Sequence, residues 1–218
     1  MSPKTPSPEI SLEGRSTDGR KLFSPSAARN AGPIRDVLVP LLPAGANVLE
    51  IGSGTGEHAE AVCRARPDVR WQPSDPDDVS RDSLAARSEE LAPALRAPVA
   101  TDASAAGWFN DFEPLDAIVC CNVIHISPWS VTLGLAAGAA QLLKPNGFIF
   151  LYGPYLEGEA SAPSNLAFDE NLRARNPDWG VRPLDAVTAT FAQHRLRLAE
   201  RIAMPANNLS LVFRRIAA

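Results

Sequence analysis

Short apolar runs alternate with longer segments of helical periodicity along most of this chain. Val48, Leu49 and Ile51 form a short buried strand pattern, and residues 115–121 form an apolar, β-branched run that follows Pro114. Because that run is apolar on both faces, we expect it in the middle of a sheet that helices cover on both sides. Further strands are expected at residues 69–72, 97–100 and 148–152, and an antiparallel hairpin is expected at residues 195–203 and 209–216.

Apolar residues at helical spacing separate these strands. Ile34, Val37 and Leu38 illustrate the pattern ahead of the first strand, where Ser24 supplies a capping side chain. Helices are expected at residues 24–42, 57–66, 82–95, 131–143 and 184–194, and a turn is expected at residues 144–147. Strands that alternate with helices predict an α/β fold with a doubly wound, mostly parallel sheet.

The length of 218 residues, 45% of them hydrophobic, suits one compact domain. We place that domain at residues 23–218. Residues 1–22 are rich in Pro, Ser and Gly with little apolar periodicity, so they are expected to be a flexible tail, with a lid as the alternative. Residues 153–182 form a long insertion between strands, which we expect to act as a lid and acceptor pocket.

Charge, cysteine content and hydropathy argue against a nucleic-acid-binding, secreted or membrane protein. The net charge is −4, and the 21 Lys and Arg residues are scattered, which argues against nucleic acid as a partner. The three cysteines show no C-x-x-C spacing and are expected to be reduced in a cytoplasmic protein. No apolar run reaches 18 residues and no signal-peptide pattern opens the sequence, so no membrane partner is expected.

The candidate chemistry begins at residues 47–58, which read N-V-L-E-I-G-S-G-T-G-E-H. Gly52, Gly54 and Gly56 predict a tight turn from a strand into a helix, where a ligand can approach the backbone closely. The free amides at the start of that helix would face the ligand. The spacing differs from the G-x-G-x-x-G dinucleotide fingerprint, which makes a nicotinamide or flavin site the less favoured alternative.

An acidic residue ends the second predicted strand about twenty residues after the glycine loop, the distance at which a ribose-binding carboxylate is found. Asp75 is our choice for that role, since a carboxylate can accept hydrogen bonds from both ribose hydroxyls. Asp77 and Asp78 are expected to charge the start of the next helix instead. No histidine lies near these residues in the sequence, and no metal site is expected.

Polar and aromatic side chains follow the fourth and fifth predicted strands. Asn122, His125 and Trp129 come after the fourth, at the edge where open α/β sheets bind ligands. His125 could take a proton from an acceptor, or it could order the loop through a backbone carbonyl. Tyr152 and Tyr155 follow the fifth strand and are candidate acceptor contacts, although buried tyrosines are common in cores.

The glycine loop resembles motif I of the class I S-adenosylmethionine-dependent methyltransferases. Longer peptides resemble the methyltransferase-like 26 family over residues 22–216. These are S-P-S-A-A-R-N, W-Q-P-S-D, N-V-I-H-I-S-P-W, L-Y-G-P-Y, S-N-L-A-F-D, N-P-D-W-G and M-P-A-N-N-L-S-L-V-F. Two small departures are Ala28, where an acidic residue is expected, and Val123, where Met is expected.

The resemblance implies a Rossmann-like class I methyltransferase fold with a seven-stranded, mostly parallel sheet whose last strand is antiparallel. It implies S-adenosylmethionine as cofactor, with S-adenosylhomocysteine as product. The three glycines would line its methionine half, Glu50 would orient the loop and the cofactor's amino group, and Asp102 would lie beside the adenine or cap a turn. From their positions, Arg29 and Asn30 could reach the cofactor carboxylate or close the pocket, with surface capping as the alternative. The remaining cofactor candidates are Ser53, His58 and Asn122.

The expected reaction is methyl transfer to a hydroxyl, thiol or amine of a small molecule. His125, Tyr152 and Tyr155 are the candidate catalytic residues, and Trp129, Asn165 and Asn208 are the candidate acceptor contacts. The alternative is a cofactor-binding module or regulatory subunit without methyl transfer of its own. The protein is expected to be a monomer or a homodimer.

Overall fold

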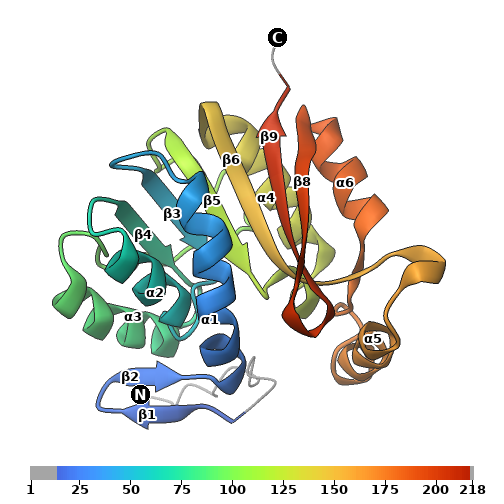
Figure 1. Cartoon of the computed structure of the whole chain (residues 1–218), viewed down its shortest axis with the longest axis horizontal. Coiled ribbons are helices and arrows are strands. Elements are labelled where there is room, and N and C mark those ends of the chain that lie inside the picture. The colour runs from blue at the N-terminus through green and yellow to red at the C-terminus, as the bar shows by residue number, and fades with distance from the viewer. Residues whose placement is uncertain (1–13, 217–218) are drawn as a thin grey trace.

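The fold is built on one mixed sheet. The computed structural model describes residues 14–216, and its seven-stranded sheet has the order β4-β3-β5-β6-β9-β8, with β7 paired to β6 (Figure 1). The strands are β3 (Asn47–Ile51), β4 (Arg70–Ser74), β5 (Leu115–Cys121), β6 (Leu143–Leu156), β7 (Arg182–Pro183), β8 (Leu196–Met204) and β9 (Asn208–Arg215). The pairs β3–β4, β3–β5, β5–β6 and β6–β7 are parallel. Strand β9 is antiparallel to both β6 and β8. The predicted α/β fold with an antiparallel last strand is therefore confirmed.

Helices cover both faces of this sheet. They are α1 (Pro25–Leu38), α2 (Glu57–Ala65), α3 (Asp78–Leu91), α4 (Trp129–Leu142), α5 (Pro163–Arg175) and α6 (Leu184–Gln193). Short 3₁₀ turns are η1 (Val39–Leu41), η2 (Ile124–Ile126), η3 (Gly158–Ala160) and η4 (Pro205–Asn207). Helix α3 starts four residues before the predicted position because the side chain of Asp77 caps it, accepting from the amide of Ser80 at 2.8 Å.

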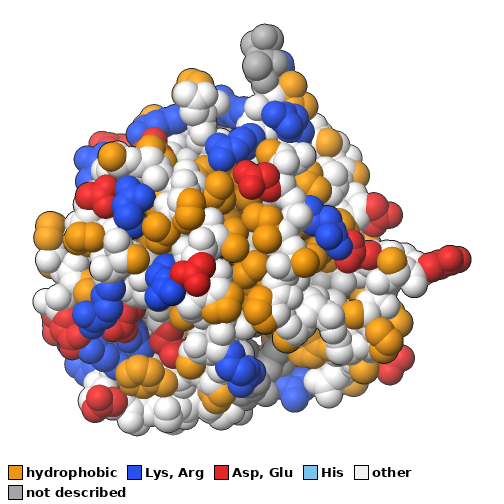
Figure 2. All heavy atoms as spheres, viewed as in Figure 1, with side chains coloured by type: hydrophobic (Ala, Val, Ile, Leu, Met, Phe, Trp, Pro, Cys, Tyr) orange, Lys and Arg blue, Asp and Glu red, His pale blue; other side chains and the backbone are white. Residues whose placement is uncertain are grey.

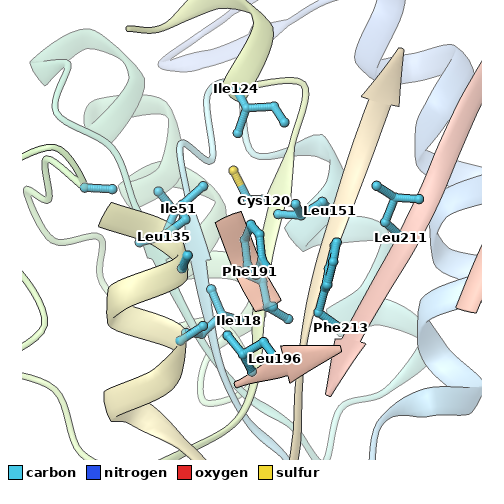
Figure 3. Packing of buried hydrophobic residues seen from close by; sticks show 14 of the residues in the cluster. Ile51, Ile118, Cys120, Ile124, Leu135, Leu151, Phe191, Leu196, Leu211 and Phe213 are labelled. Carbon is cyan, nitrogen blue, oxygen red and sulfur yellow. The ribbon is translucent and has the colours of Figure 1, made fainter. Parts of the chain in front are cut away.

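Two hydrophobic cores follow from the alternation of side chains along the strands. Ile118, Leu151 and Phe213 face α4 and α6, where the ring of Phe191 stacks on that of Phe213 at 4.4 Å between centroids (Figure 3). Val119, Phe150 and Val212 face the opposite way, toward α1 and α2. The central strands are buried on both faces, which is why their sequences are apolar without polar alternation.

The amino-terminal prediction needs correction where the structure describes it. Residues 14–22 were expected to belong to a flexible tail, but β1 (Ser16–Asp18) and β2 (Lys21–Phe23) pair as an antiparallel hairpin beside α3 (Figure 1). Arg20 forms ion pairs with Asp82 and Glu89 of α3, at 2.8 Å each. These long-range pairs leave no periodic signal in the sequence. Residues 1–13 of the predicted tail lie outside the described residues.

Two further elements differ from prediction because of their backbone chemistry. The strand expected at residues 97–100 makes a single isolated bridge to β4, between Val99 and Ser74, since Pro98 has no amide hydrogen to donate. The turn expected at residues 144–147 lies within β6, at an irregularity in its pairing with β5. There a Cβ on Gly147 would lie 3.0 Å from the carbonyl oxygen of Leu115, so a glycine permits the close approach.

The surface on the α1 side carries a band of hydrophobic side chains with charged residues on either side (Figure 2). Val37 of α1, Leu41 of η1 and Met204 of β8 are only partly buried against the core on this side. Within residues 14–216, no helix is both long and apolar enough to cross a membrane. The expectation of a monomer or homodimer stays a prediction.

Candidate functional site

The glycine loop joins β3 to α2 and has three residues in the left-handed region. Gly52, Gly54 and Gly56 have φ values of +68°, +55° and +89°. A Cβ on Gly52 would lie 2.5 Å from Cγ2 of Val123, and one on Gly56 would lie 2.8 Å from Cδ of Arg87. A Cβ on Gly54, in contrast, would meet no atom of the described chain within 4 Å. Gly54 therefore faces open space between two tightly packed glycines.

That space lies where the sheet changes direction. Strand β3 pairs with β4 on one side and with β5 on the other, so the connections leaving β3 and β5 diverge at the carboxyl edge. Ligands bind in such a crevice in open α/β sheets. The amide of Ser53 donates to the carbonyl oxygen of Ser74 at 2.9 Å, and the Ser53 hydroxyl accepts from the Ser74 amide at 3.1 Å. These bonds fix the glycine loop to the end of β4.

Asp75 lies directly beside the loop. Its Oδ2 accepts from the amide of Gly54 at 2.8 Å and its Oδ1 accepts from the amide of Asp77 at 2.9 Å. The side chain is buried, and this burial raises the pKa of Asp75 although the two backbone bonds oppose the shift. A carboxylate has about four acceptor positions. Asp75 therefore keeps acceptor capacity for hydroxyl groups next to the open space at Gly54.

Glu50 is the buried acid of the loop. It points to the α1 and α2 side of β3, where its Oε2 accepts from the indole Nε1 of Trp71 at 3.1 Å. Burial raises the pKa of Glu50 to about 7, against hydrogen bonds from Ser53 and Trp71 that favour the ionised form. The contact with Ser53 fits the predicted loop-orienting role. The predicted contact with the cofactor's amino group stays a prediction.

The other predicted cofactor residues surround the loop unevenly. His58 is buried in the first turn of α2, its Nε2 has no hydrogen-bond partner among residues 14–216, and burial lowers its pKa to about 4. Asn30 is half-buried and Arg29 exposed on α1, which packs on α2.

Asp102 is exposed and accepts from the amide and hydroxyl of Ser104, at 2.8 and 2.6 Å. These bonds make Asp102 a turn cap, as the alternative interpretation expected.

His125 and Asn122 meet beside Gly153 at the carboxyl ends of β5 and β6. Asn122 has a φ of +58°, and its amide donates to the carbonyl oxygen of Tyr152 at 2.8 Å. His125 lies in η2, where its ring is buried and edge-on to Phe168 at 5.7 Å between centroids. A Cβ on Gly153 would lie 3.3 Å from Nδ1 of His125 and 3.7 Å from Oδ1 of Asn122.

The imidazole of His125 is held neutral. Burial, followed by the positive charge of Arg182, lowers its pKa to about 3. Its Nδ1 has no hydrogen-bond partner within residues 14–216. A buried polar atom without a partner is costly, so its presence at a ligand edge points to an external partner. His125 is therefore suited to accept a hydrogen bond and poorly suited to keep a proton.

The two tyrosines do not converge. Tyr152 belongs to the core beneath α1 and α2, and Tyr155 belongs to the core beneath α4 and α6. A spacing of three residues in a strand places side chains on opposite faces. Tyr152 lies directly across from Ser210 of β9, and the hydroxyls of both have no hydrogen-bond partner within the described chain. The expectation that Tyr152 and Tyr155 contact one acceptor is therefore corrected, because their side chains lie on opposite faces of the sheet.

The side chains of the candidate acceptor residues mostly contact other parts of the protein. Asn165 donates both hydrogens of its amide nitrogen, to the carbonyl oxygens of Tyr155 at 3.1 Å and Asn207 at 3.0 Å. Asn208 donates to the carbonyl oxygen of Pro205 at 3.0 Å. Trp129 begins α4 and stacks beneath the guanidinium of Arg182, 5.6 Å from the ring centroid. Asn165 thus fastens α5 to the sheet, and its Oδ1 accepts from the hydroxyl of Ser164 at 3.5 Å.

Sequence reasoning missed two buried arginines. Arg87 of α3 donates through Nε to the carbonyl oxygen of Thr55 at 2.8 Å and through Nη2 to that of Leu22 at 2.7 Å, and it pairs with Glu60. Ser83 donates to the same Thr55 oxygen at 2.9 Å and accepts from the amide of Leu22 at 2.9 Å. Together these side chains tie the amino-terminal hairpin to the glycine loop. The other missed residue, Arg182, contacts the turn that holds His125.

Two other features bear on the site. Within residues 14–216, no three His, Cys, Asp or Glu side chains gather in a way that could hold a metal ion. A surface hollow lined by Pro67, Val69 and Leu95 lies at the amino end of β4. That end is opposite the glycine loop, so we do not assign the hollow to the candidate site.

Comparison with known proteins places this geometry in context. Residues 21–215 match a family described as "Protein of unknown function (DUF938)". Among solved structures, an O-methyltransferase family protein from Burkholderia thailandensis aligns with a TM-score of 0.76 at 15% identity, over 88% of this chain and 58% of that chain. Human N-acetylserotonin methyltransferase, solved in complex with SAM, aligns with a TM-score of 0.65 at 13% identity, over 86% of this chain and 52% of that one.

A third structure is similar in the same way. CalO1, a methyltransferase in calicheamicin biosynthesis solved in an SAH-bound form, has a TM-score of 0.68 at 16% identity, over 88% of this chain and 54% of that chain. The chain spans a little more than half the length of these three structures. At such identities the similarity shows the class I methyltransferase fold.

Proposed function

We propose that this chain, which belongs to the family described as protein of unknown function DUF938, is an S-adenosylmethionine-dependent methyltransferase with a small-molecule acceptor. The peptides quoted above support the narrower assignment to methyltransferase-like 26 proteins. Residues 23–218 would form one methyltransferase domain, active as a monomer or homodimer, with no nucleic-acid or membrane partner. The O-methyltransferase neighbours favour this reading through their fold.

The observation that carries the proposal is the open space at Gly54. It adjoins the Asp75 carboxylate and lies at the switch point of the sheet, between residues that pack tightly at Gly52 and Gly56. A backbone surface with an acidic side chain beside it suits a nucleoside with a charged amino-acid tail. The residues present therefore fit S-adenosylmethionine, which when bound supplies a methyl group on a positively charged sulfur.

The roles of the surrounding residues follow from their contacts. Asp75 would accept hydrogen bonds from the ribose hydroxyls, and the buried charge of Glu50 would favour the cationic end of the cofactor. In the reaction, a bond forms between the acceptor heteroatom and the methyl carbon while the carbon–sulfur bond breaks. Proximity and alignment would supply most of the rate enhancement, because the methyl group is already activated.

His125 would orient the acceptor. Its unpaired Nδ1 can accept a hydrogen bond from a hydroxyl or thiol placed beside Gly153. A pKa of about 3 makes the imidazole a weak base, so of the two roles left open by the sequence we favour orientation over proton removal.

Replacing Gly54 by alanine is expected to weaken S-adenosylmethionine binding about tenfold or more, because the new methyl group would fill the space that the cofactor needs. Gly45 is a matched control. It also has a positive φ, +64°, and a Cβ there would also meet nothing within 4 Å, but it lies in an exposed turn away from the loop. Isothermal titration of both variants measures the effect.

Both alanine variants should lose similar stability, since both force an alanine into a left-handed backbone conformation. Thermal unfolding checks that the two folds are equally intact. The assignment of the cofactor to this loop is overturned if Gly54→Ala binds S-adenosylmethionine as tightly as Gly45→Ala does.

The affinity for S-adenosylmethionine is expected to be about tenfold higher at pH 8 than at pH 6. The pKa of Glu50 is about 7 in the free protein, so below pH 7 the carboxyl is protonated and must release its proton to face a cationic ligand. Above pH 7 no such release is needed. S-adenosylhomocysteine keeps the α-amino group that Glu50 is expected to orient, so its affinity should rise in the same direction over this range.

Glu50→Gln is the variant that isolates this effect from the titration of Asp75. The free variant should be more stable than wild type by roughly 1–3 kcal/mol at pH 8, because it buries no ionised carboxylate. The gain should shrink toward pH 5, where Glu50 is protonated in the folded state. A pH dependence of S-adenosylmethionine binding that is unchanged in Glu50→Gln would remove Glu50 from the linkage.

The competing function is a cofactor-binding module without methyl transfer. One observation favours it, since the side chains of His125, Tyr152 and Tyr155 are each at most 3% exposed. Incubation with S-adenosylmethionine and a panel of small phenols, alcohols, thiols and amines, followed by mass spectrometry, separates the two functions. Methylated products support the transferase, and binding without any S-adenosylhomocysteine formation supports the module.

A further inference from the structure

The last part of the insertion, residues 176–182, holds the turn that carries His125. The amide of Gly180 donates to the carbonyl oxygen of His125 at 3.0 Å. Arg182 donates through Nε to the carbonyl oxygen of Ile124 at 2.8 Å and through Nη2 to that of Ser127 at 2.5 Å. Three carbonyl groups of η2 and its flank are thus bound by two residues that lie more than fifty positions later in the chain.

Arg182 is itself firmly placed. Its backbone pairs with Tyr155 of β6 through the two-residue strand β7, and its Nη2 also donates to the carbonyl oxygen of Asp178 at 2.8 Å. The side chain is buried, with its guanidinium over the ring of Trp129. Within the described residues, every hydrogen bond of this guanidinium goes to a backbone carbonyl. The planar fork of an arginine suits such multiple contacts, which a lysine cannot reproduce.

Helix α5 supports the same segment. Asp169 accepts from the amide of Val181 at 2.8 Å through Oδ1 and from Nε of Arg173 at 2.8 Å through Oδ2. A Cβ on Gly180, where φ is +156°, would lie 2.8 Å from both Asp169 and Arg173. The segment therefore fits tightly between α5 and η2.

We propose that Arg182 is a positioning residue for methyl transfer, which fixes η2 so that the unpaired Nδ1 of His125 is held against Gly153 at the carboxyl edge, as a hydrogen-bond acceptor. The inference rests on the proposed function, because it gives His125 a partner in the acceptor. The charged group that acts on His125 is Arg182 of β7. Arg182 in turn is influenced by Asp178 in the preceding turn and by Asp169 and Arg173 of α5. Of these, Arg182 contacts the η2 backbone directly.

The test combines imidazole NMR with kinetics. The chain has only three histidines, so the ¹⁵N signals of His125 can be assigned by substitution. At pH 7.5 the wild type should show one neutral tautomer with Nδ1 unprotonated. In Arg182→Met the ring should average between tautomers, and turnover should fall at least tenfold with cofactor affinity unchanged.

Arg182→Lys separates charge from geometry, and it also serves if the methionine variant does not fold. It should keep His125 neutral but lose the fixed tautomer, and its turnover should also fall at least tenfold. Arg173→Met is the matched control. It removes an exposed arginine that binds the same segment through Asp169, and it should leave both the His125 signals and turnover unchanged.

Each result is decisive. Averaged tautomers with reduced turnover in both Arg182 variants support the inference. His125 signals identical to wild type in both folded variants overturn it, whatever the rate. If wild type forms no methylated product, the proposed function fails, while the NMR comparison still decides whether Arg182 positions the imidazole.

Discussion

Replacing His125 by alanine is expected to lower methyl-transfer turnover about a hundredfold and to leave S-adenosylmethionine affinity nearly unchanged. The reason is geometric, since the ring sits at the carboxyl edge with an unpaired Nδ1 facing Gly153 and makes no hydrogen bond to the glycine loop. Turnover is measured as S-adenosylhomocysteine formation with an acceptor found in the mass-spectrometric screen, and affinity is measured by calorimetry.

The pH profile adds a second readout. Because burial and Arg182 hold the pKa of His125 at about 3, its protonation should not limit the wild-type rate between pH 5 and 8. An acceptor whose own pKa lies outside that range keeps the profile interpretable. His194→Ala, at the end of α6, is the control and should keep the wild-type rate. A wild-type rate in His125→Ala would exclude His125 from the reaction.

Arg87→Met is expected to lower the free energy of unfolding by about 3 kcal/mol. The substitution removes a guanidinium that is 1% exposed and takes away the donor to the carbonyl oxygen of Leu22. Thr55 and Glu60 each lose one of two side-chain donors and keep Ser83 and Arg64, respectively. Urea unfolding followed by circular dichroism measures the change. Cofactor affinity should also fall, since Thr55 belongs to the glycine loop.

Arg64→Met provides the comparison, because Arg64 also pairs with Glu60, at 2.7 Å, but is 56% exposed. An exposed pair of this kind stabilises by less than about 1 kcal/mol. Equal losses of stability in Arg64→Met and Arg87→Met would contradict the assigned role of Arg87 as the link between the hairpin and the loop.

The parts of the fold that could be predicted are those with periodic or conformational signals. Residues 115–121 form β5 at the predicted bounds, because an apolar, β-branched run is most stable as a sheet strand that is buried on both faces. The turn at Gly52, Gly54 and Gly56 follows from a backbone that visits the left-handed region at all three positions. The carboxyl-terminal hairpin was also predicted within one or two residues.

The parts that could not be predicted depend on contacts between distant residues. Arginines are mostly exposed, so nothing local marks Arg87 and Arg182 as buried donors to carbonyl groups far away in the chain. The hairpin of β1 and β2 likewise depends on ion pairs to α3. The opposite faces of Tyr152 and Tyr155, in contrast, follow from their spacing in a strand and could have been derived from the sequence.

Strand β9 has a consequence for how the protein is made. It lies between β6 and β8 in the sheet, although it follows every other strand in chain order. During synthesis on the ribosome, the backbone edges of β6 and β8 that pair with β9 therefore stay unpaired until β9 emerges. Of these two strands, β6 is the more hydrophobic. Such edges are templates for aggregation. Nascent chains halted before residue 208 should depend on chaperones far more than the finished protein does.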